Sequence, residues 1–400
     1  MDIINKTKVI ECIARENYDN FCHAIIKTEK LRINKTIVIF GAGILGLQFA
    51  NTLISLGISD FIFCDNDENK WGRRICNTQV VTPQSIVNRK RDYYVFLAIE
   101  NFFECAEQLK KSGYKQGDNF YNLTNCSEKK WIEDYKKDLS AEVLVLGDCT
   151  ATTISMEDQM KQSIKNLIYK ENKIKVLAMN GMYMRAFYNV LLMSLNKMEA
   201  INKVVMLLNL DIFGNKYHLL SKNQHENVFD EMFKMFEGND IEINSFMITL
   251  KERRKNTSIC NYVSPNRDED LSESKVEQGR RNHLRLNYLY DLIEDNESVR
   301  YLDKMLCKCL EYDIEPYFVF MPVNWELGEK YYGKVFYEKY NKVKDIIYNH
   351  IIDKRGKVLD LSFFLSLDDF IYLRSTNEGI RETGRRKIAQ IIMHELGEVQ

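Results

Sequence analysis

The hexapeptide GAGILG, at residues 41–46, constrains the fold of this chain more than any other stretch. It follows TIVIF, a short β-branched run typical of a buried strand, and precedes LQFANTLISLG, an amphipathic helical stretch. In such a turn Gly41 permits the tight bend, Gly43 lets a phosphate approach the backbone, and Gly46 allows the helix to pack closely on the strand. The free N–H groups that begin the helix favour an anion. These three glycines are therefore candidate cofactor-binding residues.

Two further apolar runs, 61–65 and 93–99, alternate with helical sequence after this turn. A strand–helix alternation of this kind indicates a parallel sheet with helices on its faces. We therefore predict a Rossmann-like, doubly wound α/β domain over 35–125, preceded by a helical lead-in over 1–34. Asp65 ends the second strand, near the position where an acid that binds ribose is expected in a dinucleotide fold.

A charged stretch at 126–140 predicts a linker helix, and the alternation restarts after it. We predict a second doubly wound domain over 141–400, with a flavodoxin-like, three-layer α/β/α architecture. Its five expected strands are separated by helical sequence and lie at 143–148, 173–179, 203–210, 317–324 and 357–362. The strongly charged region 251–300 predicts a helical insertion or a mobile excursion, and a helix over 383–396 closes the chain.

The composition excludes several classes of protein. The formal net charge is −1, so no global basic field indicates a nucleic-acid partner. No apolar run approaches the roughly 20 residues that span a bilayer, and no secretory signal pattern begins the chain. The ten cysteines include one close pair, Cys307 and Cys309, whose spacing fits neither a CxxC redox motif nor a zinc knuckle. We expect a soluble cytoplasmic protein without a metal site, and its oligomeric state stays open.

The stretch FIFCDNDENKWGRRICNTQVVTPQSI, which begins at Phe61, resembles a domain at the front of several bacterial glycan-biosynthesis proteins. The shared pattern is a glycine turn, then a strand followed by D-N-D-x-x-K-W-G, then V-x-x-P, and it covers about residues 35–123 here. The best-known members are sugar-nucleotide acetyltransferases, so the resemblance implies that this domain binds a nucleotide sugar in surface-polysaccharide synthesis. A nicotinamide cofactor, or a turn that binds no ligand, are the alternatives.

The stretch VLVLGDCTA, residues 143–151, resembles the opening block of the SGNH (GDSL) hydrolases, more specifically of their polysaccharide-acylation branch. In that block a serine nucleophile follows glycine and aspartate, and here Cys149 follows Asp148. A thiol at this position could attack an acyl carbonyl if a base lowered its pKa. By the same resemblance Gly181 and Asn209 are the candidate donors of an oxyanion hole.

The closing block of this family carries D-x-x-H a few residues before a glycine and a terminal helix. The glycine matches Gly384, but Thr376 stands at the aspartate position and Gly379 at the histidine position. A Ser-His-Asp mechanism needs the imidazole to take up and return the proton, and the motif here lacks it. Five other side chains are candidates to replace the missing groups: His218, His225, His283, Glu378 and Arg381.

Three functions follow from these patterns. The first is an enzyme that transfers or removes an acyl or other small group on an activated sugar, with Cys149 as nucleophile and a small-molecule or glycan substrate. The second is a catalytically inactive SGNH-like module that binds or acts as a scaffold, which the missing histidine and aspartate favour. The third is an NAD-dependent oxidoreductase that uses the glycine turn and Asp65.

Overall fold

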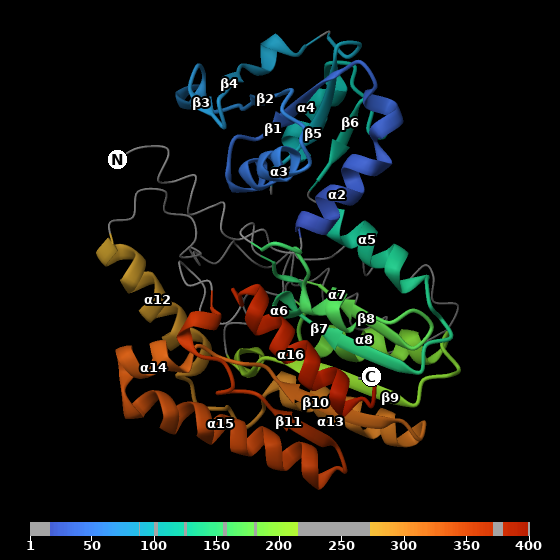
Figure 1. Ribbon diagram of the computed structural model, residues 1–400, viewed down its shortest axis with the longest axis vertical. Coiled ribbons are helices and arrows are strands. Elements are labelled where there is room, and N and C mark those ends of the chain that lie inside the picture. The colour runs from blue at the N-terminus through green and yellow to red at the C-terminus, as the bar shows by residue number, and fades with distance from the viewer. Residues whose placement is uncertain are drawn as a thin grey trace. The chain divides into compact units, whose positions relative to one another are not determined.

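The chain forms two compact units in a computed structural model, Met1–Lys130 and Trp131–Gln400 (Figure 1). The structure describes residues 17–87, 89–99, 103–123, 126–154, 158–179, 182–214, 273–370 and 379–398. Each unit consists of one sheet with helices on its faces, so the α/β class predicted from the sequence is confirmed. The division between the units falls within helix α5 (Cys126–Tyr135), in the segment predicted as a linker helix.

The described part of the first unit holds a six-stranded sheet in the order β3-β4-β2-β1-β5-β6. All neighbouring strands are parallel except β3 and β4, which form an antiparallel pair. The strand bounds are β1 Thr36–Phe40, β2 Phe61–Cys64, β3 Arg74–Ile75, β4 Thr78–Val81, β5 Tyr93–Leu97 and β6 Phe120–Asn122. The sequence predicted β1, β2 and β5, whereas the short strands β3, β4 and β6 were missed.

Side chains of β1 alternate between two hydrophobic cores, because successive residues of a strand point to opposite faces of the sheet. Ile37 and Ile39 pack beneath helices α2 and α3, while Val38 and Phe40 pack on the α4 side. Burial on both faces explains why the strand is apolar throughout rather than alternating with polar residues. The helical elements of this unit are α2 Asn17–Lys27, η1 Glu29–Arg32, α3 Ile44–Ser55, η2 Glu68–Lys70, η3 Pro83–Ser85 and α4 Phe103–Lys111.

The described part of the second unit holds a five-stranded, all-parallel sheet in the order β11-β10-β9-β7-β8. Each strand lies within a segment predicted from the sequence or begins within two residues of it. The strand bounds are β7 Val143–Gly147, β8 Ile174–Ala178, β9 Lys203–Leu208, β10 Glu315–Phe320 and β11 Lys357–Asp360.

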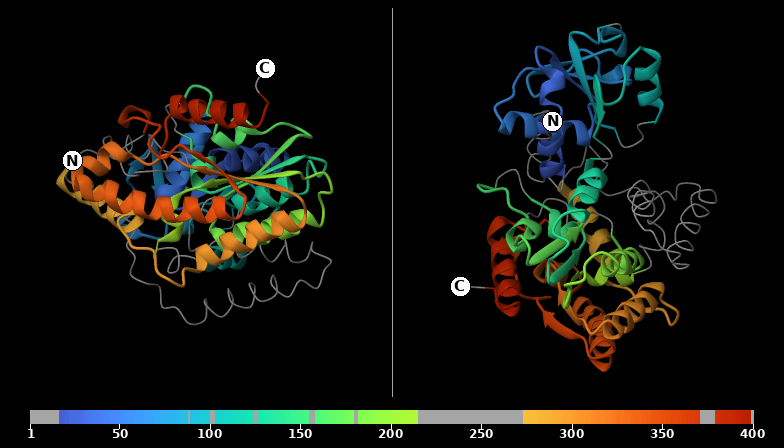
Figure 2. Two further views of the ribbon diagram at one scale, coloured as in Figure 1. Left: turned by 90° about the horizontal axis from the view of Figure 1, so that it is seen from below. Right: turned by 90° about the vertical axis from the view of Figure 1, so that its right-hand side faces the viewer.

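Helices cover both faces of this second sheet. The cluster on one face includes α8, α13 and α15, and the cluster on the other includes α6, α7 and α16 (Figure 2). The charged region 251–300 is described from residue 273 onward, where α12 buries Leu284 and Tyr288 in the first of these clusters. The helical bounds are α6 Cys149–Thr152, α7 Ile164–Ile168, α8 Met184–Leu195, η4 Leu210–Phe213, α12 Glu273–Tyr288, α13 Glu297–Glu311, α14 Trp325–Tyr332, α15 Lys334–Asp353, η5 Leu367–Asp369 and α16 Glu382–Glu395.

A buried lysine attaches the end of α5 to the second sheet. Lys175, in β8, is 2% exposed, and its ammonium donates to the carbonyl oxygens of Tyr135 at 2.7 Å and Lys137 at 2.5 Å. The last carbonyls of a helix have no intrahelical donor, so the lysine satisfies groups that α5 leaves open. Burial lowers the pKa of Lys175 to about 8, although Asp138 and Asp134 oppose this shift.

Replacement of Lys175 should therefore change how stability depends on pH. Between a folded pKa of about 8 and an unfolded pKa near about 10.4, the unfolded chain binds more protons. The free energy of unfolding should then rise with pH through this window, by on the order of 3 kcal/mol in total. Chemical denaturation of the wild type and Lys175→Met between pH 7.5 and 9.5 measures the slope, which should be smaller in the variant. Lys173→Met, at an exposed lysine nearby, should keep the wild-type slope, and equal slopes in all three proteins would contradict the assignment.

Candidate functional site

The glycine turn lies at the carboxyl end of β1, where the chain enters α3. Gly41 has φ +119°, a conformation that favours glycine, and a Cβ there would lie 2.6 Å from Ile99 Cγ1. A Cβ at Gly46 would overlap the carbonyl oxygen of Gly41, so no larger residue fits between α3 and the turn. Two of the three glycines are therefore required by the packing of the chain itself.

Gly43 differs from the other two glycines. It is the N-cap residue of α3, its φ of −106° is accessible to any residue, and a Cβ there would meet nothing within 4 Å. The glycine thus leaves open space in front of the helix, whose first N–H groups have no intrahelical acceptor. An anion such as a phosphate could approach the backbone at this point.

Asp65 connects the turn to the loop after β2. One carboxylate oxygen accepts from the Ala42 N–H at 2.7 Å and from Lys70 Nζ at 3.2 Å. The other oxygen accepts from the Asp67 N–H at 2.9 Å. The side chain is 12% exposed, and a carboxylate offers about four acceptor positions. Little capacity is left for the two hydroxyls of a ribose.

The DNDENKWG stretch folds into a compact loop in which most polar groups already have partners. Asp67 caps η2 through the Asn69 N–H at 3.0 Å, and Trp71 Nε1 donates to the Asp65 carbonyl at 2.7 Å. Gly72 has φ +76° and donates its N–H to Val80 at 2.9 Å. The residues that carry the sequence resemblance are thus also the residues that shape this loop.

Asn66 extends from this loop toward α4. Its side-chain amide donates to Gln108 Oε1 at 3.1 Å and approaches Cys105 Sγ at 3.4 Å. Gln108 also lines an open groove of about 680 Å³ between η3 and α4, whose other lining residues are Gln84, Val87, Glu104, Glu107, Lys111 and Ser112. The charged side chains that line this groove are the carboxylates of Glu104 and Glu107 and the ammonium of Lys111.

The two kinds of glycine should respond differently to an added methyl group. Gly46→Ala forces the new Cβ onto a backbone oxygen and should lower the free energy of unfolding by about 3 kcal/mol or more. Gly43→Ala adds the same methyl group in open space and should change it by no more than about 0.5 kcal/mol. Urea denaturation of both variants measures the difference. Equal losses in the two variants would contradict the packing described for this turn.

The site predicted in the second unit lies at the carboxyl ends of β7 and β9, which are neighbours in the sheet. Asp148 is 2% exposed and is the N-cap residue of α6. Its Oδ1 accepts from the Thr150 N–H at 2.9 Å and from the Thr150 hydroxyl at 2.6 Å. Its Oδ2 accepts from Asn209 Nδ2 at 2.6 Å. The structure thus brings Asp148 and Asn209 together, although they are 61 residues apart in sequence.

The Asn209 amide nitrogen also contacts Thr150 Oγ1 at 3.1 Å. Both of its hydrogens therefore have protein acceptors, and an oxyanion would have to displace one of them. Thr150 completes this network and was not among the residues singled out from the sequence. The sequence did contain an indication of this contact, because an aspartate two residues before a threonine at the start of a helix is typical of an N-cap.

Cys149 is the first residue of α6 and is 4% exposed. Its carbonyl oxygen accepts from the Thr153 N–H at 2.9 Å and from the Thr153 hydroxyl at 2.7 Å. These bonds end the short helix at Thr152, with Thr153 as its C-cap residue. An acyl donor that reacts with this thiol would need access that the described side chains largely deny.

Several other candidates lie outside the described residues: Gly181, Thr376, Glu378, His218 and His225. Gly379 is described and buried, and it offers no side chain at the position of the family histidine. Arg381 donates from Nε to the Phe370 carbonyl at 3.2 Å. This contact of Arg381 is therefore with the protein backbone.

His283 lies on the buried face of α12, 9% exposed, with Nε2 at 2.6 Å from Asn287 Nδ2. Helix α12 packs against η4, the turn that follows Asn209. Side chains that follow α12 or begin α13 hold this turn. The Tyr290 hydroxyl donates to Leu210, Ser298 Oγ donates to Ile212 at 2.8 Å, and Asn296 Nδ2 donates to Phe213 at 2.8 Å. No pattern in the sequence indicated this support.

Comparison of the chain with models of known protein families finds no match, and comparison with curated proteins finds none either. Within the described ranges, His, Cys, Asp and Glu side chains do not gather in groups of three or more that could hold a metal ion. In the same part of the chain, every helix is too short or too polar to cross a bilayer.

Proposed function

We propose that the protein binds a nucleotide sugar at the glycine turn and acts on it in the synthesis of a bacterial surface glycan. The observation that carries this proposal is the open position of Gly43. Gly41 and Gly46 serve packing, whereas a glycine at 43 has no such role and leaves room for a phosphate at the start of α3. The reaction would transfer or remove an acyl or other small group in the second unit.

The strand orders support the two family assignments on which this proposal draws. Without β3, the antiparallel partner of β4, the five parallel strands of the first sheet run β4-β2-β1-β5-β6, which matches the 3-2-1-4-5 part of the Rossmann strand order. Read from β8, the second sheet runs β8-β7-β9-β10-β11, the flavodoxin-like order compatible with an SGNH-like domain. In such sheets ligands bind at the carboxyl ends where the strand order reverses. Gly41 follows β1 and Cys149 follows β7, so both candidate residues lie at such a point.

The contacts of Asp65 argue against a dinucleotide site of the usual kind at this turn. In a dinucleotide site the acid at the end of the second strand accepts hydrogen bonds from a ribose. Here the Ala42 N–H, the Asp67 N–H and Lys70 occupy this carboxylate. We therefore rank the oxidoreductase hypothesis below the other two.

In the proposed reaction the Cys149 thiolate attacks the carbonyl of an acyl ester on the sugar, with Gly181 and Asn209 as donors to the oxyanion. The carbon–oxygen bond of the ester then breaks, and the sugar oxygen takes up a proton and leaves as a hydroxyl. Water or an acceptor hydroxyl finally takes the acyl group from the sulfur and restores the thiol.

A second candidate function is a catalytically inactive SGNH-like module, and specific observations favour it. The Asn209 amide is already engaged with Asp148 and Thr150, and Gly379 supplies no imidazole. Under this alternative the first unit still binds the nucleotide, and the second unit acts as a scaffold.

Binding at the glycine turn is tested by calorimetry with a panel of uridine, cytidine and guanosine diphosphate sugars and with NAD. We expect binding of at least one nucleotide sugar and none of NAD. Gly43→Ala should weaken this binding by about tenfold or more, because the methyl group occupies the approach of the phosphate. The variant folds normally in our expectation, so a loss of affinity reports on the site. Unchanged affinity in Gly43→Ala, or binding of NAD alone, would overturn the proposal.

The role of the thiol is tested separately with acetylated nucleotide sugars as substrates. Cys149→Ala should abolish turnover, while Cys307→Ala, at an exposed cysteine far along the chain, should retain it. Chromatographic measurement of the released acetate gives the turnover of both variants. Full activity in Cys149→Ala would show that Cys149 is not the nucleophile. Binding without any turnover in the wild type would favour the scaffold.

A further inference from the structure

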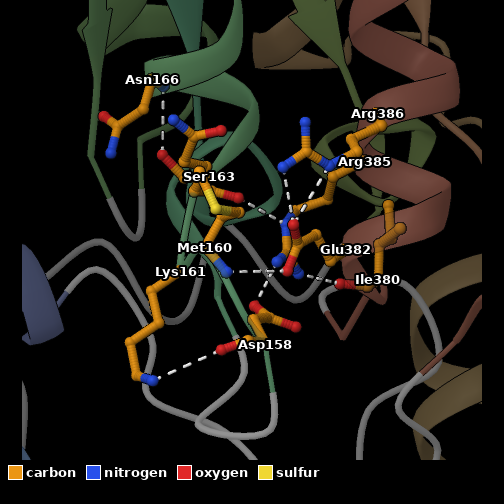
Figure 3. Close-up of polar contacts among 10 residues, drawn as sticks. Asp158, Met160, Lys161, Ser163, Asn166, Ile380, Glu382, Arg385 and Arg386 are labelled. Carbon is orange, nitrogen blue, oxygen red and sulfur yellow. Dashed lines mark hydrogen bonds and ion pairs between the residues drawn. The ribbon is translucent and has the colours of Figure 1, made fainter. Parts of the chain in front are cut away.

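A buried arginine joins two segments of the second unit that are far apart in the sequence. Arg385, in α16, is 0% exposed and donates from Nε to the Gln162 carbonyl at 2.9 Å. Its Nη1 donates to the Ile380 carbonyl, and its Nη2 forms an ion pair with Asp158 (Figure 3). We call Arg385 and these three acceptors the Arg385 clamp. It connects the segment between α6 and α7 with the entry into the closing helix.

Neighbouring contacts hold the same segments together. Glu382 accepts from the Met160 N–H at 3.2 Å and from Arg386 Nη2 at 2.7 Å, as Figure 3 shows. Gly384 brings α16 close to Ile380, since a Cβ there would lie 2.7 Å from Ile380 Cγ2. The end of the closing block therefore lies in a fixed position against residues 158–162.

Hydrophobic stabilisation alone does not explain a charged pair at this position. The Asp158 side chain is 5% exposed, so both charges have lost most of their water. Burial lowers the pKa of Arg385, while the charge of Asp158 opposes this effect. Replacement of a buried ion pair by apolar residues of similar volume is often neutral or stabilising. What the guanidinium adds is direction, because its planar fork reaches three acceptors in two segments at once.

One of the segments that the clamp joins leads into α7, which packs against α6. Ala151, two residues after Cys149, lies in one hydrophobic cluster with Ile164 of α7, Ile380 and Ile388 of α16. Gln162, an acceptor of the clamp, directly precedes the N-cap residue of α7, Ser163. Displacement of either segment would therefore open the packing around the helix that carries Cys149.

We propose, on the basis of the function proposed above, that Arg385 is a positioning residue that sets the access of small molecules to Cys149. The clamp acts through α7, which packs against α6, and through Ile380, which shares a hydrophobic cluster with Ala151. Arg385 itself touches neither the thiol nor a substrate. The clamp thereby holds α7 in a fixed position against α6, the helix that begins with Cys149. The closing block of this chain lacks the histidine and aspartate of the family that it resembles.

The experiment measures alkylation of Cys149 by iodoacetamide in the folded full-length protein, quantified by mass spectrometry of the peptide that contains it. The double variant Asp158→Leu/Arg385→Met removes both charges, so neither is left buried alone. We expect a melting temperature close to that of the wild type and alkylation of Cys149 faster by roughly tenfold or more, as expected for local opening. A purely structural pair would change the melting temperature and leave the thiol as protected as before.

Two further variants complete the design. Arg300→Met is the matched control, because Arg300 is 60% exposed, pairs with Asp295 and belongs to α13, on the other face of the sheet, and its loss should leave the alkylation rate unchanged. Arg385→Lys keeps a positive charge for Asp158 but loses the fork, so it should accelerate alkylation to an intermediate degree. If the double variant does not fold, Arg385→Lys decides the question. Wild-type protection of Cys149 in a folded clamp variant would overturn the proposal.

Alkylation and turnover separate the two proposals. The alkylation rate depends on the packing around Cys149 and requires no substrate. Faster alkylation of Cys149 in the clamp variants, together with unchanged turnover in Cys149→Ala, would support the role of the clamp and reject Cys149 as the nucleophile. Unchanged alkylation of Cys149 in the clamp variants, together with loss of turnover in Cys149→Ala, would support Cys149 as the nucleophile and reject the role of the clamp.

Discussion

Parallel pairing of buried strands is the constraint on which both candidate sites depend. Parallel strands end at the same edge of a sheet, so residues that follow different strands meet there without any proximity in sequence. In the second unit this pairing sets β7 beside β9, and Asn209 thereby reaches Asp148. In the first unit β1 lies between β2 and β5, so Gly41 contacts residues at the ends of both neighbours.

The network of Asp148, Thr150 and Asn209 illustrates how a chemical motif can become a structural one. A buried carboxylate needs hydrogen-bond donors, because burial without them costs several kcal/mol. Here Thr150 and Asn209 supply three donors, so the network stabilises the start of α6 and occupies the groups that an oxyanion hole would need. This double use explains why the same residues are compatible with a catalytic and with an inactive second unit.

The two units use their polar groups differently. In the first unit, Asp65 and the loop around it satisfy one another and leave the backbone in front of α3 open at Gly43. In the second unit, the buried Arg385 connects residues 158–162 with the start of α16. The first arrangement suits recognition of an anion by backbone N–H groups, and the second is the one that we propose controls access to a buried thiol.

The sequence by itself determined the α/β class, the predicted strands of the second sheet and the glycine turn, because these depend on local periodicity and on backbone freedom. It also indicated Asp148, Cys149 and Asn209 as residues that follow strands. It missed β3 and β6, which span two and three residues, and β4, in which Val80 is the one buried residue of four. Only the tertiary structure decided that Gly43 is the glycine without a packing role and that Asp65 has protein partners. The same holds for Thr150, Asn296 and Arg385, whose partners lie up to 227 residues away in the chain. Contacts at such separations depend on the order of strands in the sheet, which no local pattern specifies.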